Sequence, residues 1–374
     1  MHSFLSKFFA AHSRKLIALG FSAYGLYLRF QNLAARNLWL DELNQIQNTA
    51  GAFKPFWLRL TYGERTCFPG DYLLTYPFVQ MFPDNKWGMA IPHILSTVLG
   101  FYLLYLICQK HLKTIWAFAM AFAVMCFNSN LIFHAFELRP YAVLTTLGLA
   151  AFHFSYLLIY EGDRLKRLQK ILVGAFFTLT VAYHAYGIMI VFFSLAFFLF
   201  CRTQEKTPLE LIREHFTFLL ALGLAAGPIF WWYAAGNPDF DFQSSRFSGM
   251  STFDYIPNPL IDWNKFMRQV FFGGLIGYKK FKFLINGITL ALLLPQKNRF
   301  RQLGFFMLLV LIPIELKLNA DLHKGYWFLH RQFVWIMPLF AFYLAWCWDS
   351  VIVFVSDKSN WKNFPERFKP WRKA

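Results

Sequence analysis

The short motif with the clearest chemistry is Leu38-Trp39-Leu40-Asp41-Glu42, which holds two adjacent carboxylates. A carboxylate in a poorly hydrated place has raised basicity and can take a proton from a hydroxyl group. The pair is therefore a candidate proton acceptor. Two solvated loop acids, or a helix N-cap, explain the same dipeptide as well, because it is weakly specific.

Two further motifs combine charged, histidine and tyrosine side chains. In Phe136-Glu137-Leu138-Arg139-Pro140-Tyr141, the guanidinium of Arg139 offers a forked donor for phosphate, which Glu137 would orient. The alternative is that Glu137 and Arg139 only neutralise each other. In Tyr183-His184-Ala185-Tyr186-Gly187, the histidine and tyrosines are candidates for binding, although such residues are more often structural at a membrane interface.

The last motif runs from His323 to Arg331 and carries two histidines, Lys324 and Arg331. Cations close to a leaflet suit a lipid-linked phosphate. They are equally typical of snorkelling side chains. No HExxH, Walker A, GxSxG or GxGxxG motif occurs, so the sequence gives no support to a soluble hydrolase, an NTPase or a dinucleotide enzyme.

The elements that must position these motifs are membrane helices. Of the 374 residues, 57% are hydrophobic and 15% are charged, and 47 are phenylalanine, which excludes a soluble enzyme. A span needs about 20 mostly apolar residues. About ten stretches qualify as candidates, several of them short: 15–33, 89–109, 114–133, 140–160, 170–183, 186–201, 216–234, 281–295, 303–318 and 332–350. The predicted fold is an all-α polytopic transmembrane bundle.

The charges orient this bundle. The net charge of +17 does not require nucleic acid as a partner, because Lys and Arg collect in the cytoplasmic loops of membrane proteins. Their placing puts both termini in the cytoplasm, with a transmembrane domain over 1–350 and a basic cytoplasmic tail over 351–374. Most acids then fall on the outer face, within the long first loop 34–88, a second outer segment 235–280 and the short turns. In the first loop, 53–60 and 72–82 are amphipathic. The second is too short to cross, which favours a juxtamembrane helix.

The order of these motifs resembles the GT-C superfamily of membrane glycosyltransferases, in the branch with protein O-mannosyltransferases and lipid A aminoarabinose transferases. The family's Leu-Trp-x-Asp-Glu loop is similar to residues 38–42, and its Glu-Ala-Arg-x-Tyr-Ala turn to residues 137–142. A Thr-His-Tyr hairpin corresponds to 183–187, and an Arg-Tyr followed by a Pro to Arg331 and Pro338. Departures occur at 68–73, where the family's His-Pro-Pro is Phe-Pro-Gly and Asp71 is new, and at Gln332 in place of Tyr.

The resemblance implies an inverting enzyme of the cytoplasmic membrane. It would move a sugar from a polyprenyl-phosphate carrier to a hydroxyl acceptor (lipid, glycan or protein) at the outer face. Asp41 and Glu42 would be catalytic. The substrate-binding residues would be Asp71, Glu137, Arg139, Tyr141, His184, Tyr186, Lys324 and Arg331. No cofactor is firmly predicted, and a divalent cation on Asp41, Glu42 and Glu137 is the weaker alternative. A polysaccharide polymerase or ligase is the rival function, followed by a lipid or solute transporter, which would place ionisable residues in mid-span.

Overall fold

A computed structural model describes residues 2–62, 69–184, 186–203, 205–235, 278–294, 299–316 and 330–357. Within these ranges every regular element is helical and no strand occurs, so the all-α prediction is confirmed for the described part of the chain. Most of the predicted outer segment 235–280, Lys324 and the tail beyond 357 lie outside these residues.

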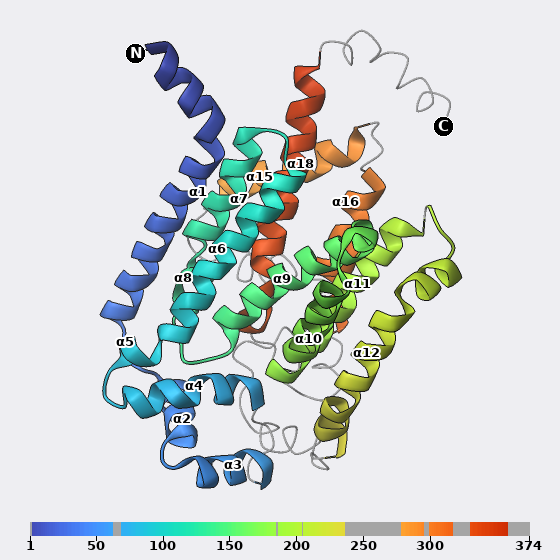
Figure 1. Cartoon of the computed structure of the whole chain (residues 1–374). Helices are drawn as coiled ribbons and strands as arrows, with labels where there is room; N and C mark the ends of the chain where they lie inside the picture. The colour runs from blue at the N-terminus through green and yellow to red at the C-terminus, as the bar shows by residue number, and fades with distance from the viewer. Residues whose placement is uncertain are drawn as a thin grey trace.

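The bundle is built from long helices that run between two ends of the molecule (Figure 1). Its helices are α1 (His2–Ala35), α6 (Ile91–His111), α7 (Ile115–Phe127), α9 (Tyr141–Tyr160), α10 (Arg167–Tyr183), α11 (Tyr186–Arg202), α12 (Pro208–Ala235), α15 (Tyr278–Leu293), α16 (Arg299–Phe305) and α18 (Met337–Ser356). Short elements complete it: α8 (Ser129–Phe133), η1 (Gly162–Arg164), the π-helical η2 (Phe306–Leu311) and η3 (His330–Ile336).

Three segments of the described chain are long and apolar enough to cross a membrane, namely Ile91–His111, Tyr141–Tyr160 and Phe333–Ser356. The helices Ile115–Phe127 and Tyr186–Arg202 are apolar but shorter. The apolar helices therefore indicate a membrane protein, and the larger number of about ten spans stays a prediction.

One predicted span is broken. The apolar stretch 114–133 forms two helices, α7 and α8, because the side chain of Asn128 accepts a hydrogen bond from the backbone N–H of Leu131 and caps α8. A polar cap inside an apolar run starts a new helix where hydrophobicity alone predicts one continuous helix.

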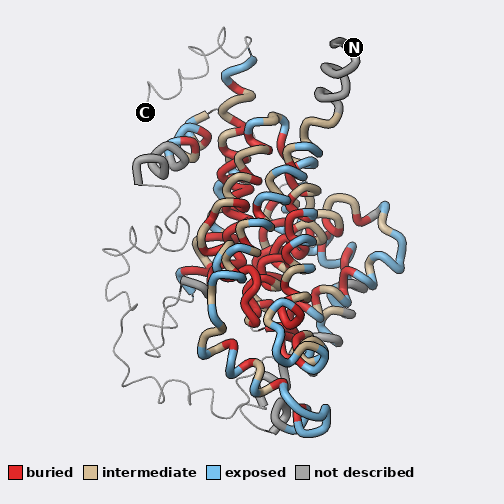
Figure 2. The backbone as a smooth tube through the Cα atoms, turned by 90° about the vertical axis from the view of Figure 1, so that its left-hand side faces the viewer, coloured by how far each residue is buried: buried red, intermediate tan, exposed pale blue. Residues whose placement is uncertain are grey.

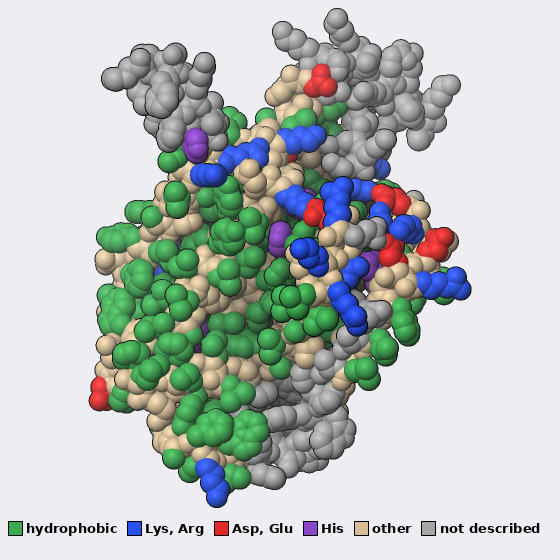
Figure 3. All heavy atoms as spheres, in the orientation of Figure 1, with side chains coloured by type: hydrophobic (Ala, Val, Ile, Leu, Met, Phe, Trp, Pro, Cys, Tyr) green, Lys and Arg blue, Asp and Glu red, His purple; other side chains and the backbone are tan. Residues whose placement is uncertain are grey.

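The centre of the bundle is packed with aromatic rings, including the fully buried Phe118, Phe122, Phe152 and Phe305. Buried residues fill the middle of the molecule (Figure 2). The same helices carry large apolar side chains on their outer faces, such as Leu95 and Leu99 of α6 and Leu19 of α1. Figure 3 shows hydrophobic side chains spread over one whole side of the bundle. Apolar surface of this extent is typical of helices that contact lipid.

Four short helices lie together at one end of the bundle: α2 (Leu40–Thr49), α3 (Phe53–Tyr62), α4 (Pro69–Met81) and α5 (Lys86–Met89). The helix α1 begins and α18 ends at the opposite end (Figure 1). The amphipathic stretches 53–60 and 72–82 of the first loop correspond to α3 and α4. These short helices hold the acidic motif and Asp71, so they carry one half of the candidate site.

Candidate functional site

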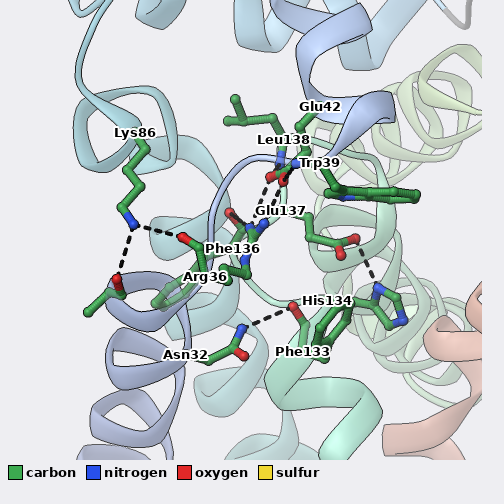
Figure 4. A network of polar contacts seen from close by, with 11 residues as sticks. Asn32, Arg36, Trp39, Glu42, Lys86, Phe133, His134, Phe136, Glu137 and Leu138 are labelled. Atoms are coloured by element: carbon green, nitrogen blue, oxygen red, sulfur yellow. Dashed lines mark hydrogen bonds and ion pairs between the residues drawn. The ribbon is translucent and has the colours of Figure 1, made fainter.

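The acidic pair lies in the first turn of α2, and its two carboxylates have different surroundings. Glu42 is fully buried and accepts two hydrogen bonds from the guanidinium of Arg36, at 2.5 and 2.9 Å. It also accepts the backbone N–H of Trp39 at 3.2 Å and that of Leu138 at 3.0 Å (Figure 4). Four donors occupy this carboxylate. Glu42 therefore connects α2 to the end of α1 and to the turn before α9.

The same connection is fixed by other contacts drawn in Figure 4. Arg36 also donates to the carbonyl of Phe136 at 3.3 Å. The ammonium of Lys86 donates to the carbonyls of Ala34 and Arg36, at 3.2 and 2.9 Å. Carbonyls at a helix C-terminus have no partner within the helix, and a cation stabilises them. The chain between α1 and α2 is thus held at a defined place, and Asp41 with it.

Asp41 is half-buried and interacts electrostatically with Arg139. Arg139 lies in the turn that precedes α9, and the buried Nε of its guanidinium has no hydrogen-bond partner among the described residues. Burial alone would lower the pKa of Arg139, but Tyr141, Asp71 and Asp41 nearby raise it overall, so the guanidinium stays charged. Arg139 is thus a cation among acidic groups, and no described carboxylate accepts a hydrogen bond from it.

Asp71, in the first turn of α4, also interacts electrostatically with Arg139. Its carboxylate accepts the hydroxyl of Tyr183 at 2.7 Å and the amide of Gln45 at 2.9 Å. Burial raises the pKa of Asp71, while Tyr183, Arg139 and Gln45 oppose that rise. Three helices, α2, α4 and α10, therefore meet at one buried carboxyl group.

The approach of α4 to α10 depends on a glycine. A Cβ placed on Gly70 would lie 2.4 Å from the Cα of Tyr183 and 3.0 Å from the carbonyl oxygen of Ala182. Any side chain there would push the two helices apart. Gly70 thus permits the contact between Asp71 and Tyr183.

His184 follows α10 directly and is buried. Its Nδ1 accepts the backbone N–H of Tyr186 at 3.2 Å, and the two rings stack with centroids 5.0 Å apart. Burial, with a smaller effect from Arg139, lowers the pKa of His184 to about 3. The imidazole is neutral at pH 7 and carries its proton on Nε2, so it offers a hydrogen bond and no charge.

The described hydrogen bond of Glu137 goes to His134 and not to Arg139. The carboxylate of Glu137 is fully buried and lies 2.9 Å from Nδ1 of His134 (Figure 4). Tyr141, at the start of α9, is buried and contributes to the electrostatics of Arg139. Lys324 and the side chain of Arg331 lie outside the described residues, although the backbone of Arg331 belongs to η3.

The structure thus brings together Asp41, Asp71, Arg139, Tyr141 and His184, which come from three motifs and from the departure at 68–73. Three further participants are absent from the sequence prediction as site residues: Arg36, Gln45 and Tyr183. Tyr183 could have been identified from its place beside His184 in the histidine motif. Gln45 could have been identified from its position one helical turn after Asp41. Among the described residues, no group of three or more His, Cys, Asp or Glu side chains is arranged to hold a metal ion.

No known family model matches the chain, and no curated protein matches it either.

Proposed function

We propose that the chain is an inverting glycosyltransferase that transfers a sugar from a polyprenyl-phosphate carrier to an acceptor hydroxyl. The observation that carries this proposal is the state of Arg139, whose guanidinium stays charged beside Asp71 and Asp41 and whose buried Nε has no described hydrogen-bond partner. It lies within electrostatic range of the half-buried Asp41. A phosphate binder beside a carboxylate base is the pair of groups that such a transfer requires.

The placing of this site fits a lipid-linked donor. We propose a bundle of about ten spans in the cytoplasmic membrane, with both termini in the cytoplasm and the site at the outer face. The position of α2, α3 and α4 at the end opposite the start of α1 supports this arrangement. Exposed apolar side chains on α3, among them Phe53, Trp57 and Leu58, suit contact with the headgroup region of the leaflet that would hold the donor.

In the proposed reaction, the carboxylate of Asp41 takes the proton of the acceptor hydroxyl. The acceptor oxygen forms a bond to the anomeric carbon, and the bond from that carbon to the phosphate oxygen breaks on the opposite side. The leaving group is the polyprenyl phosphate anion. Arg139 stabilises its charge. Glu42 keeps Asp41 in position through Arg36 and Leu138.

Substitution of Asp41 by Asn tests the proposal. Reconstituted protein would be supplied with a panel of radiolabelled polyprenyl-phosphate hexoses, and release of polyprenyl phosphate would be measured with and without membrane extract as acceptor. Loss of a general base lowers such a rate by about 100- to 10,000-fold. Asp84, an exposed acid of the same end of the molecule, provides the matched control Asp84→Asn, which should keep wild-type activity. Unchanged turnover of the Asp41 variant would remove Asp41 as the base.

A further inference from the structure

The ends of α10 and α12 that lie far from the candidate site carry a group of cations with no ion pair to a described side chain. Arg164, Lys166 and Arg167 are exposed where α9 connects to α10, and Arg213 is exposed in α12. None of the four forms an ion pair with a described carboxylate. Other cations of this end are neutralised, since Lys110 pairs with Glu161 and Lys206 with Glu214.

These cations belong to one surface. The helices α10 and α12 pack side by side and run in the same direction (Figure 1). The connection before α10 touches α12 directly, because a Cβ on Gly162 would lie 3.4 Å from the ring of His215. Figure 3 shows Lys and Arg side chains gathered at this end of the molecule. Asp163 is the remaining acid of the segment 161–170, which carries four Lys and Arg residues.

Each helix continues from its cations into an exposed apolar stripe. On α10 the stripe consists of Leu168, Ile171, Leu172 and Leu179, which are 56–66% exposed. On α12 it consists of Leu209, Ile212, Phe216, Leu220 and Leu224. Spacings of three, four and eleven residues place each set on one helix face. Both stripes lack cover from any residue that the structure describes.

The length of the stripe matches one leaflet. Eleven residues separate Leu168 from Leu179, and at about 1.5 Å per residue they extend about 16 Å. Half of a hydrocarbon core of about 30 Å is about 15 Å. A cationic end followed by an apolar face of this length is complementary in charge and dimension to a phospholipid, with its headgroup on the cations and its acyl chains along the stripe.

We infer that the α10–α12 face binds an anionic phospholipid of the leaflet opposite the candidate site. Binding uses Arg164, Lys166, Arg167 and Arg213 for the phosphate and the two stripes for the acyl chains. The inference depends on the membrane placement of the chain and is independent of the proposed transfer reaction.

Lipid titration of the full chain in a nonionic detergent, followed by native mass spectrometry, tests this inference. The probes are phosphatidylglycerol and phosphatidylcholine with identical acyl chains. The wild type should retain phosphatidylglycerol preferentially at low salt. Loss of three cations in Arg164→Gln/Lys166→Gln/Arg167→Gln should weaken that binding by on the order of 100-fold and abolish the preference. The control Lys15→Gln/Lys54→Gln/Lys113→Gln removes three exposed cations elsewhere and should keep it.

Three results would overturn the inference. The wild type would bind both lipids equally if the face is covered by a second copy of the chain or by another protein. The two triple variants would behave alike if only overall charge matters. Free glycerol phosphate would displace the lipid at equal concentration if the cations form a site for a soluble anion, because a site that uses the acyl chains discriminates against the headgroup alone.

Discussion

The ion pair between Glu42 and Arg36 allows the positioning role of Glu42 to be separated from a direct catalytic one. In Glu42→Ala, the guanidinium of Arg36, whose side chain is 12% exposed, loses both charge-assisted hydrogen bonds. The backbone N–H groups of Trp39 and Leu138 lose their acceptor as well. Removal of one partner of a buried pair is destabilising by about 3–5 kcal/mol. Since about 1.4 kcal/mol corresponds to a tenfold change, the equilibrium constant for local opening of α2 should rise by at least about 100-fold.

The loss should be local, because α2 lies at the edge of the bundle and its contacts are few compared with those of the core helices. Hydrogen–deuterium exchange of the purified protein measures it directly. Amides of 37–49 and 136–139 should exchange about 100-fold faster in Glu42→Ala, while those of α9 keep their protection. Activity should fall with the same variant, since Asp41 then loses its fixed position.

The double variant Arg36→Met/Glu42→Met provides the control. It removes both charges with side chains of similar length, so no unpaired buried charge remains. The free energy of local opening of 37–49 should return to within about 2 kcal/mol of the wild-type value. The remaining difference would come from the backbone N–H groups of Trp39 and Leu138, which have lost their acceptor. Activity should recover in part with it. A Glu42→Ala protein with wild-type exchange but no activity would refute the positioning role and return Glu42 to direct catalysis.

Three other predictions concern the same site. Arg139→Gln should raise the KM for a polyprenyl-phosphate donor at least tenfold with unchanged protection of α9, and an unchanged KM would remove it from the phosphate site. The pKa of Asp71 is raised in the folded chain, so the folded state holds the proton more tightly and stability falls as pH rises from about 4 through the raised pKa. Thermal unfolding of Asp71→Asn should lack this decline, and a parallel decline would contradict it. Gly70→Ala should lower stability, because its Cβ meets Tyr183, whereas Gly20→Ala, with nothing within 4 Å, should be neutral or stabilising by about 0.5–1 kcal/mol.

The helices were predictable where an apolar run is long and uninterrupted. The predicted spans 89–109 and 140–160 agree with α6 and α9 to within two residues. The break at Asn128 was not predictable from hydrophobicity, because it depends on a single side chain that caps α8. The π-helical turn over Phe306–Leu311 is also not predictable from hydrophobicity, because all of its residues are apolar. Local capping and packing, not composition, decide such interruptions.

The candidate site was predictable as a set of motifs and not as a set of partners. The sequence identified Asp41 and Arg139 as separate candidates, and the structure places them within electrostatic range. It paired Glu137 with Arg139 because they are neighbours in the chain, whereas Glu137 contacts His134. The sequence also does not show that the two acids of the pair have different surroundings. Only the tertiary contacts with Arg36 and Leu138 show that the carboxylate of Glu42 already accepts hydrogen bonds. Partners separated by about a hundred residues follow from packing, which single-sequence patterns do not contain.

Three arginines of the described chain, of which Arg29 is buried and Arg36 and Arg139 are half-buried, bear on the proposal of a ligand at this site. A buried guanidinium is costly unless its donors are satisfied. Arg29 donates to the carbonyls of Gly25, Met125 and Cys126, and Arg36 is bound by Glu42. Arg139 has carboxylates nearby, and its buried Nε has no described hydrogen-bond partner. The terminal nitrogens of Arg29 and Arg36 have fixed partners, and no such bond is described for Arg139. Under the proposed function, the acceptor for Arg139 arrives with the substrate, and a phosphate matches the fork of its donors.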